Sequence, residues 1–167
     1  MMHRVYNVKN HQLLTINDIS KLEAISHKKF DLAQRILLID LGNTQHLLEV
    51  INNTATKIRV IEQVEEKNII KRKSCIISST NNILAYANSK IYCKIIPLPV
   101  LDEIRERRKG IGKILLYHRM EIFKKITEIG YVSEKYIFKN YSLYHKEHRI
   151  CRINEIFPTE LKKSKIM

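Results

Sequence analysis

An arginine between two lysines is the first residue of this sequence that could do specific chemistry. It lies in IIKRKSCIIS, residues 69–78, whose β-branched residues are typical of a strand. In a strand, Arg72 shares one face with Ile70 and Ser74, and the flanking lysines share the other. Arg72 is therefore expected to point inward, where its guanidinium needs an anion and matches the shape of a carboxylate. A structural ion pair and a bound ligand are both open as that anion.

An acidic residue near the C-terminus is the second candidate. In CRINEIF, residues 151–157, Glu155 shares a strand face with Cys151 and Ile153, which the apolar neighbours mark as the buried face. Arg72 and Glu155 together predict a site for a small carboxylated molecule.

Three other patterns suggest different chemistry but are less specific. His145 and His148 lack acidic or cysteine partners at ligand spacing, so no metal site is expected. The turn Gly110-Ile111-Gly112 matches neither the Walker spacing nor the dinucleotide fingerprint, and is interpreted as a tight turn where backbone approaches another group. The basic clusters at 71–73 and 105–109 would suit phosphate contacts. They keep nucleic-acid binding as an alternative, although no nucleic-acid-binding motif accompanies them.

The elements that must position these residues change in type along the chain. Apolar residues at helical spacing predict helices in the first third: one from Thr15, capped by Asn17 or Asp18, one from Phe30 to Leu41 that ends near Gly42, and one over 44–53. Alternating residues then predict strands at 57–65, 69–78 and 83–94, the last two joined by a turn at 79–82. A short helix at 101–108, an amphipathic helical segment at 119–129 and a strand pair at 138–144 and 149–157 follow.

Helices followed by a sheet predict an α+β fold with an antiparallel sheet flanked by N-terminal and inserted helices. The length of 167 residues suits a single domain over 1–167, with its core at about 15–158 and a basic tail at 161–167. The composition, 44% hydrophobic with 4 Gly and 3 Pro, is that of a packed globular protein and excludes a disordered one.

The net charge of +13 attracts anions generally: nucleic acid, an anionic membrane surface or a small polycarboxylate. Part of it can also reflect a compositional bias of the source genome, spread over solvated faces. The three cysteines are expected to be buried thiols in a reducing compartment. No apolar run reaches the roughly 20 residues that cross a bilayer and no secretory signal is visible, so a soluble protein is expected.

The order of these segments resembles the chorismate pyruvate-lyase superfamily, including its short archaeal, cyanobacterial and chloroplast-encoded members. The resemblance runs from about Phe30 to Pro158. It rests on five segments in order: RILLIDLGNTQHLLEVI, IIKRKSCII, ILAYANSKIYCKIIP, KGIGKILL and RINEIF. Gly110 departs from the pattern, since it stands where the bacterial enzymes have proline. Asn43 replaces an apolar residue near the pocket, and RKS follows the family's Arg-Glu only at the arginine.

The resemblance implies an enzyme that eliminates pyruvate from chorismate, leaves 4-hydroxybenzoate for quinone biosynthesis or another pathway, and uses no metal or organic cofactor. It implies that Arg72 holds a substrate carboxylate and that the backbone amide of Ile111, beside Gly112, donates a hydrogen bond. Asn43 would lie near the pocket, and Glu155 would act as a proton donor or orient the substrate. A monomer in the cytoplasm, or in the plastid stroma if chloroplast-encoded, would follow. A non-catalytic effector-binding domain of the same fold is the alternative.

Overall fold

A computed structural model describes residues 4–10, 13–133 and 135–159 and shows an antiparallel sheet of seven strands with helices on one side. The strands are β1 (Val5–Lys9), β2 (Thr56–Glu66), β3 (Ile69–Ser78), β4 (Ile83–Tyr92), β5 (Phe123–Val132), β6 (Tyr136–His145) and β7 (His148–Pro158). The helices are α1 (Ile16–Ser26), α2 (Leu32–Ile39), α3 (Thr44–Asn52), α4 (Leu98–Arg105) and α5 (Ile111–Tyr117), with a 3₁₀ turn at Cys93–Ile95. The predicted α+β class is confirmed.

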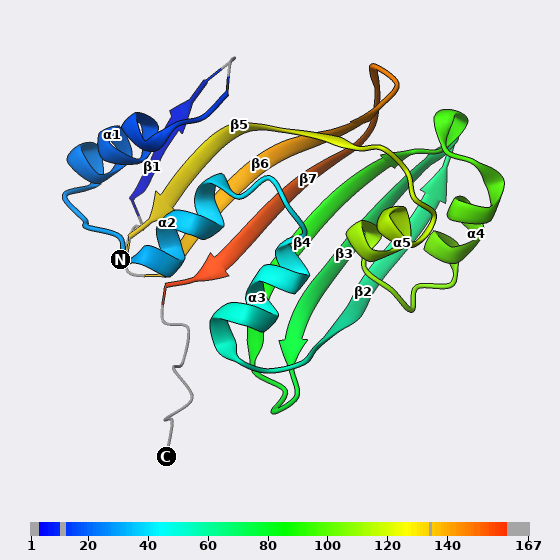
Figure 1. Ribbon diagram of the computed structural model, residues 1–167, viewed down its shortest axis with the longest axis horizontal. Coiled ribbons are helices and arrows are strands. Elements are labelled where there is room, and N and C mark those ends of the chain that lie inside the picture. Colours follow the sequence, from blue (N-terminus) through cyan, green and yellow to red (C-terminus); the bar gives the residue numbers. More distant parts are fainter. Residues whose placement is uncertain (1–3, 11–12, 134, 160–167) are drawn as a thin grey trace.

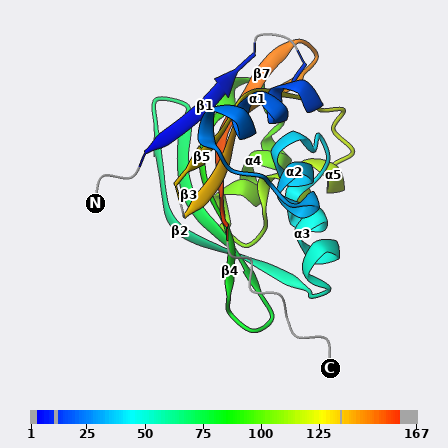
Figure 2. The same cartoon turned by 90° about the vertical axis from the view of Figure 1, so that its left-hand side faces the viewer.

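The order of strands in the sheet is β1-β5-β6-β7-β4-β3-β2. The C-terminal strand β7 therefore lies in the middle, between the hairpins β5–β6 and β3–β4, which places Glu155 at the centre of the sheet. Figure 1 shows the sheet with the helices in front of it, and Figure 2 shows α2, α3 and α5 together on one side of the strands. The face turned toward these helices carries the core.

Local sequence explains where the first helices begin. The predicted caps of α1, Asn17 and Asp18, are wrong: Thr15 is the N-cap, and Asp18 accepts a hydrogen bond from its backbone amide at 2.9 Å. Asp31 caps α2 through the Gln34 amide at 2.8 Å. Asn43 caps α3, where its side chain accepts from the backbone amide of His46 at 3.1 Å.

Several sequence predictions are wrong at the level of elements. The segment 119–129, predicted as helical, belongs largely to strand β5, in which the buried Lys124 and Ile126 alternate with more exposed neighbours. The helix predicted at 101–108 begins earlier, at Leu98, because Pro99 suits the first turn of a helix rather than ending one. Helix α5 and strand β1 were not predicted. The basic tail predicted from residue 161 lies outside the described residues.

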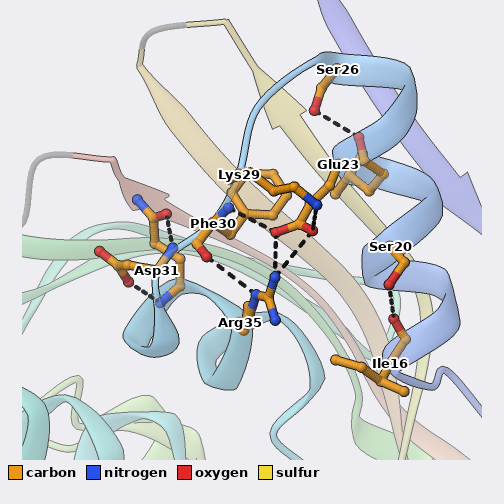
Figure 3. Close-up of polar contacts among 10 residues, drawn as sticks. Ile16, Ser20, Glu23, Ser26, Lys29, Phe30, Asp31 and Arg35 are labelled. Carbon is orange, nitrogen blue, oxygen red and sulfur yellow. Dashed lines mark hydrogen bonds and ion pairs between the residues drawn. The ribbon is translucent and has the colours of Figure 1, made fainter.

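A buried carboxylate joins α1 to α2 and is fully paired (Figure 3). Glu23 accepts from the backbone amide of Phe30 at 2.9 Å, from Arg35 at 2.9 and 3.1 Å and from Lys29 at 3.2 Å. The hydrogen bond from the Phe30 amide has the largest effect on the pKa of Glu23. Together with the two cations it holds that pKa below its usual value. This cluster fixes α1 against the start of α2, away from the middle of the sheet.

The three cysteines are buried free thiols, as predicted. Within the described ranges, no helix is long and apolar enough to cross a bilayer.

Candidate active site

A cavity of about 290 Å³ lies between the inner face of the sheet and the beginnings of α3 and α5. Its volume is close to the lower end of the range for small-molecule sites, and its walls are mostly apolar with a few polar groups. Every site residue predicted from the sequence lines this one cavity: Asn43, Arg72, Ile111, Gly112 and Glu155. The structure thus brings together residues up to 112 positions apart in sequence, while their roles stay predictions.

Arg72 points inward from β3, as the strand alternation predicted, and is only 2% exposed. Its Nε donates to Gln63 Oε1 at 2.6 Å, Nη1 donates to the carbonyl of Lys109 at 3.1 Å and Nη2 donates to the carbonyl of Ile104. All three acceptors are neutral. Among the described residues, no carboxylate lies within 4 Å of the guanidinium.

The guanidinium is therefore a buried charge without a counter-ion from the described chain. Burial, and to a smaller extent the charge of Arg107, lower the pKa of Arg72 to about 10, so it stays protonated at neutral pH. A guanidinium has five N–H groups, and three are used. One N–H on each Nη atom has no acceptor among the described residues, which leaves a pair of donors for a carboxylate.

Glu155 lies on β7 with both oxygens hydrogen-bonded. Tyr141 donates to Oε1 at 2.7 Å and Thr44 donates to Oε2 at 2.8 Å, while Lys139 Nζ lies 3.5 Å from Oε2. Burial has the largest effect on the pKa of Tyr141 and, with the nearby charge of Glu155, raises it well above its usual value. The phenol therefore keeps its proton and donates a hydrogen bond. Two hydroxyl donors and a cation thus surround one carboxyl group.

Arg72 and Glu155 do not form an ion pair with each other. Strand register places them in adjacent rows of the inner face: Arg72 lies opposite Ser89, and Glu155 lies opposite Ala87 on the same neighbouring strand. The structural ion pair that was one reading of the sequence is therefore not formed between these two. Both charges face the same cavity instead.

The segment 110–112, interpreted from the sequence as a tight turn, is instead the start of α5 and closes the cavity from the helical side. Gly110 is the N-cap of α5 and Ile111 its first residue, so the Ile111 amide belongs to the first turn, whose N–H groups have no partner within the helix. A Cβ on Gly112 would lie 3.0 Å from Asn43 Nδ2, and one on Gly110 would lie 3.1 Å from Gln45 Oε1. These glycines let the starts of α3 and α5 meet over the cavity.

Two buried lysines beside the cavity were missed in the sequence. Lys124, on β5, lines the cavity, and Lys139, on β6, is fully buried behind Glu155. Lys124 alternates with Ile126 on the inner face, the same pattern that revealed Arg72. The helical spacing of apolar residues over 119–129 hides this alternation in the sequence. Thr44 and Tyr141, the hydroxyl partners of Glu155, were also missed as site residues.

Four cations of the two basic clusters form ion pairs with carboxylates of the described chain. Lys71 and Lys73 lie on the outer face and pair with Glu66 at 3.3 Å and Glu62 at 2.7 Å. In the second cluster, Arg105 pairs with Glu65 and Asp102, and Lys109 pairs with Glu103. These carboxylates offset part of the charge that phosphate contacts would need.

The model of the Rv2949c-like chorismate pyruvate-lyase family matches residues 32–165. That range holds α2 and every later element, and with them all the residues of the cavity described above. The chain belongs to this family. The resemblance read from the sequence is thereby confirmed. No curated protein matches the chain.

Membership in this lyase family agrees with the shape of the site. The family name points to a small-molecule substrate and to lyase chemistry. The cavity offers a small volume, an unpaired guanidinium at one wall and a hydrogen-bonded carboxylate in the middle.

Proposed function

We propose that the protein is a chorismate pyruvate-lyase that converts chorismate into 4-hydroxybenzoate and pyruvate. The observation that carries this proposal is Arg72: a buried guanidinium with only neutral acceptors among the described residues and a free N–H on each Nη atom. A carboxylate of the substrate supplies the missing negative charge in a two-pronged pair. The family match supports the choice of chorismate as the carboxylated substrate.

Bound in this way, the ring carboxylate lies at Arg72 and the ring extends over the inner face of the sheet. The row of residues that begins at Arg72 continues through Ser89 and Ile153 to Tyr141. Ile153 offers an apolar surface under the ring, and the Ile111 amide, in the first turn of α5, donates to the substrate. The opposite end of the ring, which carries the hydroxyl and the enolpyruvyl ether, then lies near Glu155.

The reaction is an elimination. The ether C–O bond breaks and its electron pair leaves with the enolpyruvate, while the neighbouring ring carbon loses a proton and the ring becomes aromatic. The enolate takes up one proton and tautomerises to pyruvate, so atoms and charge balance. Glu155 accepts a hydrogen bond from the substrate hydroxyl, since each carboxylate oxygen can accept more than the one hydroxyl it already binds.

The site would thus work by positioning and by excluding water rather than by a cofactor. Arg72 and Glu155 fix the two ends of the ring, and the apolar wall packs against the ring and excludes water.

Incubation of the purified protein with chorismate tests the proposal. Pyruvate, measured with lactate dehydrogenase, and 4-hydroxybenzoate, measured by chromatography, should appear in equal amounts. Glu155→Gln should lower kcat/KM by roughly 100-fold, as expected for a group that orients or transfers a proton. Glu147→Gln, an exposed carboxylate in the turn between β6 and β7, is the matched control and should be unchanged.

Three outcomes would count against the enzyme. Unchanged chorismate with folded protein would exclude the lyase activity. Tight binding of chorismate without turnover would instead support an effector-binding domain of the same fold. Retention of random oligonucleotide at rising salt would favour nucleic-acid binding.

A further inference from the structure

A second buried cation faces the cavity from the strand β5. Lys124 is 6% exposed and lines the cavity, although it is a long charged side chain. Its Nζ donates to the carbonyl of Gly42 at 2.9 Å and lies 4.4 Å from the centre of the Tyr141 ring. Both contacts are favourable to an ammonium group, but neither carries a negative charge.

The carboxylates near Lys124 either pair with another residue or lie more than 4 Å from its Nζ atom. Lys139, from β6, forms an ion pair with the Glu155 carboxylate at 3.5 Å. Asp40, at the end of α2, and Glu155 both attract Lys124, but neither carboxylate lies within 4 Å of its Nζ. Of the groups described, none forms an ion pair with Lys124. The cavity therefore holds two buried cations, Arg72 and Lys124, without counter-ions of their own.

The two cations lie on different strands at opposite sides of the cavity. Arg72 lies on β3 and Lys124 on β5, with β4, β7 and β6 between them. Adjacent strands are about 4.8 Å apart, so four steps of the sheet separate the two backbones, and the long side chains reduce the distance between the charges. Lys124 leans toward the middle of the sheet, over Tyr141. Glu155 lies on β7, between the two.

We propose that Lys124 binds the second carboxylate of a dicarboxylate ligand whose first carboxylate is held by Arg72. This rests on the proposed function, in which the substrate carries one carboxylate on the ring and another on the enolpyruvyl ether. With the ring carboxylate at Arg72, the ether side points past Glu155 toward Lys124. Lys124 is then the residue that selects a dianion over a monoanion.

The surroundings of Lys124 also set the pH range in which its side chain is charged. Burial has the largest effect on the pKa of Lys124 and, with the neighbouring Lys139, lowers it to about 8. The charges of Glu155 and Asp40 act in the opposite direction and raise this pKa. The protonated form, which binds the carboxylate, is therefore present below about pH 8 and is lost as the pH rises through that value. Tyr141, the remaining titratable neighbour, stays a neutral phenol throughout.

Two unreactive probes test this without relying on turnover. They are 3-methoxybenzoate, with one carboxylate, and 3-(carboxymethoxy)benzoate, which adds a second carboxylate on the ether. We expect wild type to bind the dicarboxylate more tightly by roughly 10- to 100-fold in titration calorimetry, the range for one charge-assisted hydrogen bond. Lys124→Met should abolish that preference and leave the affinity for 3-methoxybenzoate within about twofold. Lys125→Met, a neighbour on the other face of β5, should retain it.

The pH dependence gives a second measurement that does not need the methionine variant to fold. In wild type, the preference for the dicarboxylate should decline above about pH 8. In Lys124→Arg, which stays charged, it should persist to about pH 9.5. Any titration of Arg72 affects both probes and cancels in the ratio.

The outcomes separate this proposal from the proposed function. Equal binding of both probes to wild type, or a preference that survives in Lys124→Met, would overturn the role of Lys124 while leaving the carboxylate site at Arg72 intact. Binding of neither probe would overturn both.

Discussion

Two buried charges in this protein have opposite surroundings. Glu23, between α1 and α2, accepts four hydrogen bonds, three of them from cations of the same chain. Arg72, in the sheet, donates to three neutral acceptors and has no carboxylate within reach among the described residues. A charge that the chain neutralises itself fixes structure. A charge that it buries and leaves without a counter-ion is prepared for a ligand.

The strongest way to break this comparison is to remove the unpaired charge. Arg72→Met should lower kcat/KM for chorismate by about 100- to 1000-fold, equal to roughly 3–4 kcal/mol, because the substrate carboxylate loses a buried ionic partner. The free energy of unfolding should change by no more than about 1–2 kcal/mol, since the lost contacts are hydrogen bonds to neutral groups. Initial rates of pyruvate release measure the first quantity. Lys71→Met, on the outer face, is the control and should retain full activity.

The paired charge should behave in the opposite way. Glu23→Ala should lower the free energy of unfolding by about 2 kcal/mol, because the buried amide of Phe30 loses its acceptor. The cost is limited because Lys29 and Arg35 are 85% and 38% exposed and can turn to water. Urea unfolding measures it, and kcat/KM at a temperature where the protein is folded should be unchanged. A large loss of activity would mean that the two regions are not independent.

The pH dependence of stability sharpens the same contrast. The pKa of Glu23 is lowered by folding, so its contribution is fully present above the unfolded value of about 4.3 and is lost as the pH falls through the lower folded value. The difference in unfolding free energy between wild type and Glu23→Gln should therefore be constant near neutral pH and shrink on acidification. Urea titrations at about pH 7 and pH 3.5 check this. A difference that is independent of pH would contradict the assignment of the charge.

The smallest effect is expected at the wall of the cavity. Gly112→Ala places a Cβ 3.0 Å from Asn43 Nδ2, and the amide must shift while it caps α3. We expect KM for chorismate to rise about three- to tenfold, with less than about 1 kcal/mol lost in stability, because a flexible side chain can adapt. Steady-state kinetics and a melting curve measure the two. An unchanged KM would mean that the substrate does not contact the start of α5.

Strand alternation was enough to predict the inward position of Arg72 and the buried face that carries Glu155. It failed for Lys124, because apolar residues over 119–129 fit helical spacing as well as a strand, and only pairing with β6 decides between them. The acceptors of Arg72 were also out of reach. Two of the three are carbonyls at Ile104 and Lys109, and only the folded chain brings that segment over β3.

The neighbours of Glu155 show the same limit. Thr44 and Tyr141 lie 111 and 14 residues away from it in sequence, and no local pattern links a helix start to two strands. Types of residue on a strand face could be predicted, whereas partners across elements could not.

The binding of 4-hydroxybenzoate measures most directly whether Arg72 is kept for a ligand. This product retains the ring carboxylate and can be titrated without turnover. Arg72→Met should weaken its affinity by at least about 30-fold, whereas Arg35→Met, which removes the paired arginine, should leave it within about twofold. Equal affinity of wild type and Arg72→Met would contradict the account.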